Sequence, residues 1–250
     1  MWLVLCSSSD ASAHWAFQGL LQMGLAPLQL VTAESLASAR AWEHHVNSSG
    51  AHVTITLANG AVIRSSQIRG VLNRLVAPSD FTARCAVDAY RQYAAAETQA
   101  FYLSWLHALP GAVINRPAPL GLSGPWFHAS EWTLRASRAG LRTCTYRQSA
   151  RDSAAITDAR RASFSRERTA AHHVIALHGE IFGAQVPSDV AHACGRLAKA
   201  ANTRMLGLQL NSREGDEWTF ADATVLPDLR AGGVPLLRRM AQILVTGEPS

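Results

Sequence analysis

Short apolar segments alternate with helical segments along the first part of this chain, and no other feature of the sequence restricts the fold as strongly. The expected buried strands lie at residues 2–6, 28–31, 68–75 and 112–115. Helical periodicity follows the first strand as far as Gly24 and reappears over residues 82–107. Alternating strands and helices favour a mostly parallel sheet with helices on its faces. We therefore predict an open α/β domain over residues 1–117.

Two further elements are expected inside this domain. Residues 32–42 are predicted to form a helix with His44 and His45 at its end, where an imidazolium interacts favourably with the helix dipole. Residues 52–57 and 61–66 alternate between apolar and polar side chains on either side of the tight-turn dipeptide Asn59-Gly60. This pattern is typical of a β-hairpin.

The second half of the chain, residues 118–250, has a different order of elements. Strands are expected at 143–146, 174–177, 181–184, 206–210 and 217–221, and helices at 130–139, 187–202 and 234–245. Hairpin-like strand pairs of this kind indicate an α+β domain. Periodicity fails over residues 148–168, which we interpret as an irregular segment.

Composition excludes several classes of protein. The formal charge of +5 and a pI of about 9.4 would suit a nucleic-acid or membrane partner. However, Lys199 is the only lysine, and the basic stretch from Arg147 to Arg168 is interrupted by Ser, Ala and Asp and is poor in aromatic residues. No apolar run approaches the roughly 18 residues of a membrane helix. We predict neither nucleic-acid nor membrane binding.

Four cysteines are widely separated, at positions 6, 85, 144 and 194. They form no C-x-x-C pair and no short secreted framework. The spacing predicts a cytoplasmic protein whose thiols are mostly buried and structural.

A set of polar side chains near the strand ends of the first domain is our predicted ligand-binding site: Arg69, Asn73, Arg74, Asn115 and Arg116. Open α/β sheets bind ligands at the carboxyl ends of their strands, and guanidinium groups there bind a carboxylate or phosphate through two hydrogen bonds. The alternative is structural pairing of Arg74 and Arg116 with carboxylates at positions 80, 88 or 97.

Three histidines and one glutamate could suggest a metal centre: His172, His173, His178 and Glu180. On a strand His172 and His178 share one face and His173 lies on the other, so we favour ordinary strand and turn histidines. The serines at 7–9 are interpreted as helix-capping residues and residues 121–124 as a plain turn.

The order of these elements resembles the ATP-grasp superfamily of carboxylate-amine and carboxylate-thiol ligases, including the branch that glutamylates proteins and modifies ribosomally made peptides. The segments that carry the resemblance are Ile68–Arg74, Ala112–Pro117, His173–Ala184, Gly207–Leu210 and Glu217–Ala223. The resemblance implies that residues 1–117 are the domain that precedes the ATP-grasp domain. It also implies that residues 118–250 are a reduced ATP-grasp-like domain.

The sequence departs from this family at the residues that the ligation chemistry needs. The family places lysines beside ATP on a small lobe, whereas Lys199 falls on a later helix and residues 147–173 are expected to be too short for that lobe. The family positions that ligate Mg²⁺ correspond here to Gln209, Ala221 and Ala223, and methyl groups cannot bind a cation. By strand alternation Asp222 lies on the opposite face, unless a one-residue slip brings it into use.

The resemblance and the departures together lead to three hypotheses. The first is a degenerate protein that needs no metal or cofactor and binds a small acid, a peptide or a protein partner. The alternative is an active carboxylate-amine ligase that uses ATP and Mg with rearranged residues, among them Asp222 or Asp216. The third is an oligomeric scaffold, such as a homodimer, whose interface contains the closing helix and the tryptophans at 105, 126 and 132.

Overall fold

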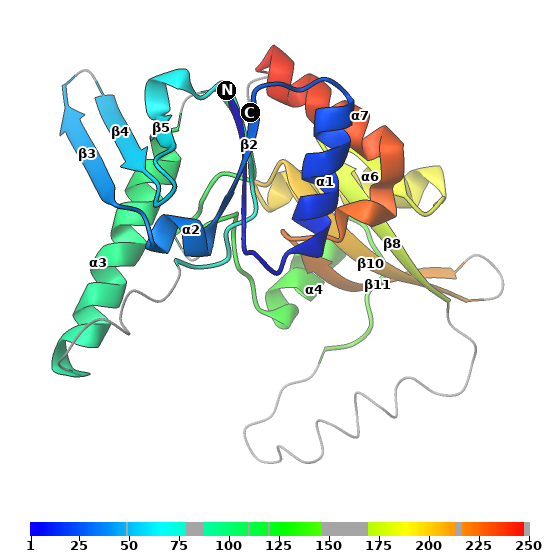
Figure 1. The fold of residues 1–250 in the computed structure, drawn as a ribbon. Coiled ribbons are helices and arrows are strands. Elements are labelled where there is room, and N and C mark those ends of the chain that lie inside the picture. Colours follow the sequence, from blue (N-terminus) through cyan, green and yellow to red (C-terminus); the bar gives the residue numbers. More distant parts are fainter. Residues whose placement is uncertain are drawn as a thin grey trace.

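The computed structural model describes residues 1–48, 50–78, 88–109, 111–119, 121–146, 170–213 and 217–247. Within these ranges the chain forms two four-stranded sheets and a smaller three-stranded sheet. Figure 1 shows the small sheet and the long helix α3 on one side of the molecule and the second four-stranded sheet on the other. The mixture of a parallel sheet with antiparallel sheets confirms the predicted α/β and α+β combination.

The first sheet is parallel and has the strand order β2-β1-β6-β7. Its strands are β1 (Trp2–Cys6), β2 (Leu28–Thr32), β6 (Gly70–Asn73) and β7 (Ala112–Ile114). One face packs on α1 (Ala11–Gln22) and α7 (Gly233–Thr246), and the other packs on α2 (Ala33–Ala37) and α3 (Asp88–His107). This is the predicted open sheet with helices on both faces.

The second sheet is antiparallel and has the order β11-β10-β8-β9. Its strands are β8 (Ala170–Leu177), β9 (Glu180–Gly183), β10 (Met205–Arg213) and β11 (Glu217–Thr224). One face packs on α4 (Ala129–Arg138) and α6 (Ser188–Ala200). The other face packs on α7 at one end only, through Ile175, Leu177 and Met205. At its other end, none of the described helices packs on this second face.

Helix α7 connects the two sheets. Its buried residues belong to the same core cluster as β1, β6 and β7 on one side and β8 and β10 on the other. The closing helix therefore packs against the first domain, although it lies at the far end of the chain. The predicted boundary at residue 117 stays a prediction.

The third sheet corrects one sequence-based expectation. Residues 32–42 do not form one helix, because α2 ends at Ala37 and β3 (Ala41–Asn47) begins four residues later. This strand pairs with β4 (Gly50–Thr56), which pairs with β5 (Val62–Arg64) in the predicted hairpin. His44 and His45 therefore lie on a strand opposite Val53 and His52, not at a helix end.

Two other segments differ from the expected elements or cannot be compared. Residues 143–146 were expected to form a strand, but Thr143 makes only an isolated parallel bridge to Phe220. Residues 82–87 and 148–168 lie outside the described part of the chain. Two short 3-10 helices, η1 (Ser65–Gln67) and η3 (Leu229–Gly232), complete the described elements. In the described part of the chain, no helix is both long and apolar enough to cross a membrane.

Candidate functional site

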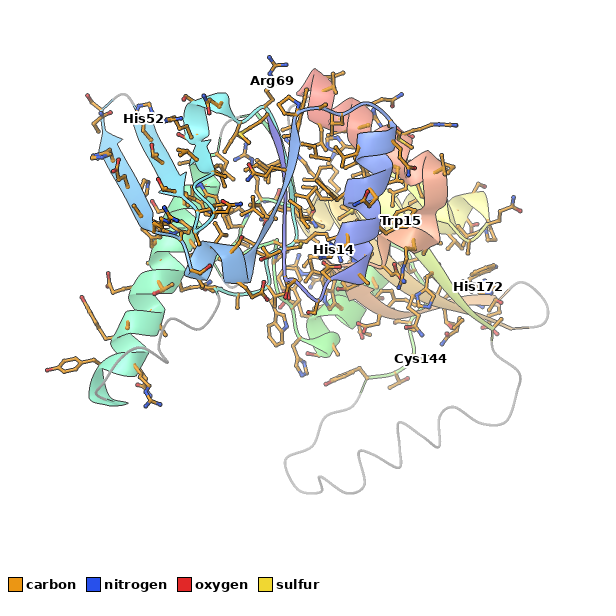
Figure 2. All side chains as sticks on the ribbon, viewed as in Figure 1. His14, Trp15, His52, Arg69, Cys144 and His172 are labelled. Atoms are coloured by element: carbon orange, nitrogen blue, oxygen red, sulfur yellow. The ribbon has the colours of Figure 1, made fainter. Side chains whose placement is uncertain are left out.

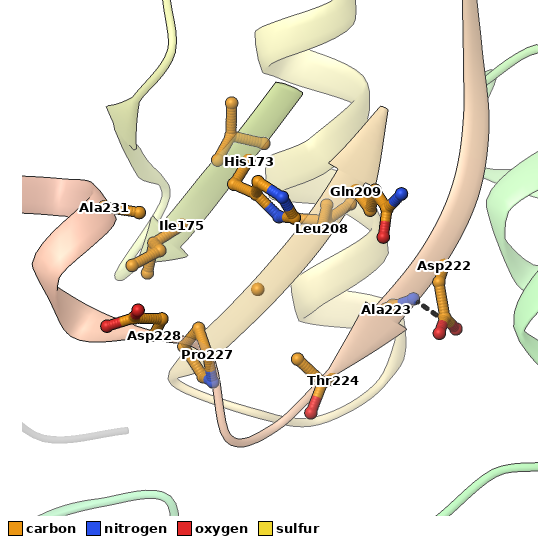
Figure 3. Close-up of a pocket in the computed structure, with 12 residues that line it drawn as sticks. His173, Ile175, Leu208, Gln209, Asp222, Ala223, Thr224, Pro227, Asp228 and Ala231 are labelled. Atoms are coloured by element: carbon orange, nitrogen blue, oxygen red, sulfur yellow. Dashed lines mark hydrogen bonds between the residues drawn. The ribbon is translucent and has the colours of Figure 1, made fainter. Parts of the chain in front are cut away.

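A depression of about 250 Å³ lies on the open face of the second sheet, between the strands and the segment that leads from β11 to α7. Figure 3 shows its lining, in which His173, Gln209 and Asp222 come from three strands and Pro227 and Asp228 from the connecting segment. The remaining lining residues are Val174, Ile175, Gly207, Leu208, Ala223, Thr224 and Ala231.

Strand register places three of these side chains in one row. Gln209 on β10 pairs with His173 on β8 and with Asp222 on β11. Next to this row Gly207 pairs with Thr224. Residues two apart on a strand face the same side, so Asp222 and Thr224 share the pocket face and the buried Ala223 belongs to the core under α4 and α6.

A β-bulge determines which residues of β11 reach this face. The register shifts between Gln209 and Leu210, whose partners are Asp222 and Phe220, so that Ala221 has no partner of its own on β10. The resemblance placed Ala221 and Ala223 at the positions of the family's metal ligands, with Asp222 on the opposite face. The bulge instead produces the one-residue slip that brings Asp222 to the pocket.

The described lining of the pocket is acidic. It contains the carboxylates of Asp222 and Asp228 and no lysine or arginine. One oxygen of Asp222 accepts the backbone N–H of Ala223 at 2.8 Å. Asp228 accepts from Arg230 Nε at 2.8 Å and Nη2 at 2.7 Å, and this hydrogen bonding is the main cause that holds the pKa of Asp228 below its ordinary value.

A glycine allows the connecting segment to close one end of the pocket. A Cβ atom at position 207 would lie 2.5 Å from the Cβ of Pro227, which is closer than two carbon atoms can approach. Pro227 therefore packs directly against the strand because residue 207 has no side chain. The backbone carbonyl of Pro227 also accepts a hydrogen bond from Arg74 at 3.0 Å.

None of the predicted ligand-binding residues of the first domain lines this pocket, although Arg74 contacts it through Pro227, and three of them are buried. Asn73 Nδ2 donates to the carbonyl oxygens of Asn115 and Leu122 at 2.9 and 2.6 Å. Arg74 forms an ion pair with Asp10 at 2.8 Å. The described carboxylate partner of Arg74 is therefore at position 10 and not at position 97, while the side chains at positions 80 and 88 lie outside the described part of the chain.

Asn115 connects the two sheets through its side chain. Its Nδ2 donates to the carbonyls of Met205 and Val225 at 3.0 and 2.9 Å, and its Oδ1 accepts from Met205 N and Thr203 Oγ1, both at 2.9 Å. The backbone has a φ of 61°, a left-handed conformation that asparagine tolerates better than most residues. Both polar atoms of the Asn115 side chain are therefore used in hydrogen bonds that join the two sheets.

The other two residues of the predicted set are more exposed. Arg116 donates to the carbonyls of His107, Leu109 and Gly111 at 3.5, 3.5 and 3.2 Å. Arg69 (Figure 2) precedes β6 and lies over the Trp2 ring at 5.5 Å, at the amino edge of the sheet, whereas Arg74 follows the other end of β6. The structure therefore does not gather the five residues, and their ligand-binding role stays a prediction.

The serine cluster after β1 binds a carboxylate of the chain itself. Glu34 accepts the backbone N–H of Ser8 at 3.0 Å and the hydroxyl of Ser7 at 3.3 Å. The cap of α1 is Asp10, which accepts from Ala13 N at 2.9 Å. The helix cap is therefore the residue after the serines.

The histidines near β8 lie apart, as strand alternation predicts for two of them. His172 packs on Trp218 with ring centroids 4.6 Å apart and contacts Ser212 Oγ at 2.8 Å, whereas His173 lines the pocket on the other face. Figure 2 shows His172 near one end of the second sheet. No group of three or more His, Cys, Asp or Glu side chains that could hold a metal occurs within the described ranges.

Sequence reasoning missed Thr224, Pro227 and Asp228 as pocket residues. The alternation Asp222-x-Thr224 was a usable signal for the first of them. Pro227 and Asp228 lie in a connection whose path depends on packing against β10, and no local pattern indicates it.

The chain was compared with known proteins at the level of sequence and of structure. No protein-family model and no curated protein matches it. Among solved structures, the macrocyclase MdnC of Microcystis aeruginosa MRC, bound with precursor peptide MdnA, superposes with a TM-score of 0.75 and 11% identity over 99% of this chain and 100% of that chain. The macrocyclase MdnB of the same organism gives 0.64 and 14% over 98% and 99%.

A third similar structure is a Chryseobacterium gregarium RiPP-associated ATP-grasp ligase in complex with ADP and a leader and core peptide. It gives a TM-score of 0.64 and 7% identity over 99% of this chain and 97% of that chain. At such identities the similarity establishes the fold alone. The chain has the fold of ATP-grasp ligases, as the sequence resemblance implied.

Proposed function

We propose that this protein binds a peptide on an ATP-grasp scaffold and has lost ATP-dependent ligation. The observation that carries the proposal is the charge of the pocket, whose described lining has two carboxylates and no lysine or arginine. Arg230 pairs with Asp228 from outside the lining, so the negative charge of the pocket belongs to Asp222. A triphosphate would meet negative charge there instead of the lysine or arginine that phosphoryl transfer needs. The only lysine, Lys199, is exposed on α6, on the other side of the sheet.

The donor set also fits Mg²⁺ poorly. The ion prefers six oxygen ligands and is held in nucleotide sites by one or two carboxylates together with substrate phosphates. Here Asp222 is the only carboxylate in the strand row, one of its oxygens is already bonded to Ala223 N, and its neighbour in the row is the neutral Gln209. The described residues of this pocket do not fit the metal and nucleotide of the fold family.

The same lining suits a peptide better. Gln209 and Thr224 offer both hydrogen-bond donors and acceptors, and Asp222 accepts from an N–H group. Ile175 and Pro227 add an apolar floor. A pocket of about 250 Å³ has room for a peptide side chain and its backbone amides. Two of the similar structures contain precursor peptides, which supports this class of ligand.

A second candidate function is an active ligase with a rearranged site. The favourable observation is that the bulge brings Asp222 to the pocket face beside Thr224, where a carboxylate and a hydroxyl could face a metal. Under this alternative Asp222 would be essential for magnesium-dependent nucleotide binding.

Calorimetric titration of ATP, with and without Mg²⁺, into the folded protein tests the two candidates. We expect no measurable heat at millimolar nucleotide. Magnesium-dependent binding that disappears in Asp222→Asn would overturn the proposed loss of ligation and establish the second candidate.

Peptide binding is tested separately, by selection from a displayed random-peptide library. We expect enriched peptides to bind the wild type and to lose binding to Thr224→Trp, because the indole would fill the pocket from an exposed position. Equal binding to both proteins would place the peptide elsewhere and remove the support for this pocket.

A further inference from the structure

A second depression, of about 310 Å³, lies between α4 and α6, on the outer side of the helices that cover the opposite face of the sheet from the first pocket. Arginines 135, 138 and 196 and one acidic residue, Glu131, line it. Leu134, Ala139 and Ala200 complete the lining. Nothing in the proposed function uses this depression, and the inference below is independent of it.

The two helices fix two of the arginines at the pocket by capping each other. Arg135 on α4 donates Nη1–H to the carbonyl of Ala200 at the end of α6, at 2.9 Å. Arg196 on α6 donates Nε–H to the carbonyl of Ala139 at the end of α4, at 3.0 Å. These reciprocal bonds satisfy carbonyls that a helix end leaves free, and they hold both guanidinium groups at the same depression.

Arg135 is neutralised locally, whereas the other two arginines keep hydrogen-bonding capacity. Arg135 binds Glu131 Oε1 through Nε and Nη2, at 2.9 and 2.7 Å, and lies over the Phe127 ring at 4.1 Å. Arg138 is exposed and has no hydrogen-bond or ion-pair partner among the described residues. Among the described residues, Arg196 forms one hydrogen bond, through Nε. Its two terminal nitrogens, Nη1 and Nη2, therefore remain available to a ligand.

The pocket therefore combines two available guanidinium groups with an apolar wall. Leu134 is 49% exposed and lines the same depression as Arg138. Guanidinium groups recognise carboxylates through paired charge-assisted hydrogen bonds. The lining contains no aromatic side chain on which a nucleic-acid base could stack.

We propose that the depression between α4 and α6 binds an acidic peptide segment. A Glu or Asp carboxylate would accept hydrogen bonds from Arg138 and Arg196, and a neighbouring aliphatic side chain would pack on Leu134. Charge complementarity and the exposed leucine together favour a peptide of mixed acidic and aliphatic composition over a simple anion.

Fluorescence anisotropy with a short labelled peptide of alternating Glu and Leu tests this proposal on the full chain. Arg138→Glu should weaken binding by about tenfold or more, since it removes a charge-assisted bond and adds repulsion. The matched control is Arg238→Glu, which makes the same charge change at an exposed position of α7 and should leave the affinity within about twofold. Both substitutions are at exposed side chains, so both proteins should fold.

A second variant separates peptide recognition from simple anion binding. Leu134→Asn should weaken the Glu-Leu peptide more than a Glu-Ser peptide of equal length. The proposal would be overturned if a Gln-Leu peptide bound the wild type as tightly as the Glu-Leu peptide does. It would also be overturned if Arg138→Glu and Arg238→Glu weakened the affinity for the Glu-Leu peptide by the same factor. So would tighter, Arg138-dependent binding of an oligo-uridine RNA, because it would identify a nucleic-acid site.

Discussion

Asn115 and Met205 exchange two hydrogen bonds across the junction of the two large sheets. The Asn115 side chain donates to the Met205 carbonyl at 3.0 Å and accepts the Met205 N–H at 2.9 Å. Both groups are buried, so neither has water as a substitute partner. A single side chain at the end of β7 thus fixes the start of β10, the strand that carries Gln209 to the pocket.

We predict that Asn115→Ala lowers the free energy of unfolding by about 3 kcal/mol, since it leaves the buried N–H of Met205 without its acceptor, whereas the Met205 carbonyl keeps Thr203 Oγ1 as a donor. Alanine also disfavours the φ of 61° at this position. Asn115→Gly accommodates that φ, so the glycine variant should recover about 1 kcal/mol. Urea denaturation of the three proteins measures both effects. Identical stabilities of the alanine variant and the wild type would show that the junction does not depend on these bonds.

The buried ion pair between Arg74 and Asp10 gives a second stability prediction. Arg74→Met should cost about 3 kcal/mol, because it strands a carboxylate that is 17% exposed. The double variant with Asp10→Asn should recover part of that cost. Arg142→Met, which breaks an exposed ion pair with Glu217, should cost less than about 1 kcal/mol. If the double variant lost as much stability as the two single variants together, Arg74 and Asp10 would not be coupled.

The sequence predicted most elements of the fold but missed β3, and the reason is physical. The strand lies at the edge of its sheet and five of its seven residues are exposed, so apolar alternation is weak. What stabilises it is distant: Trp42 packs on Phe101 of α3 with centroids 5.0 Å apart. Periodicity within a short window contains no such information.

The candidate site was less predictable for a similar reason. The bulge beside Gln209 depends on how β11 pairs with β10, and a change of one residue moves every following side chain to the other face. The partner of Arg74 is likewise 64 residues away, whereas sequence reasoning considered nearer carboxylates. The types of residue were visible in the sequence, and their pairing was not.

Thiol labelling tests the burial of the cysteines. Burial raises the pKa of Cys6 and of Cys194 to about 12, so both remain protonated and unreactive near neutral pH. Cys144 is exposed (Figure 2), whereas the other two described cysteines are buried, as expected for most of the thiols. In a Cys85→Ser background we expect a disulfide reagent to modify one thiol in the native protein and all three in urea. Modification of more than one native thiol would contradict the described core, and adding Cys144→Ser should abolish the native reaction.

The carboxylate of Glu34 gives a pH-dependent prediction. Burial acts to raise its pKa, but hydrogen bonds from the backbone and from Ser8 outweigh burial and hold the pKa below the ordinary 4.5. The folded state therefore binds fewer protons than the unfolded state, so Glu34 stabilises the fold above pH 4.5 and this contribution disappears as the pH falls through the folded-state pKa. We expect Glu34→Gln to have a lower urea midpoint than the wild type at pH 7, and the two midpoints to converge in acid. A midpoint difference that stays constant with pH would show that the serine loop does not stabilise the ionised carboxylate.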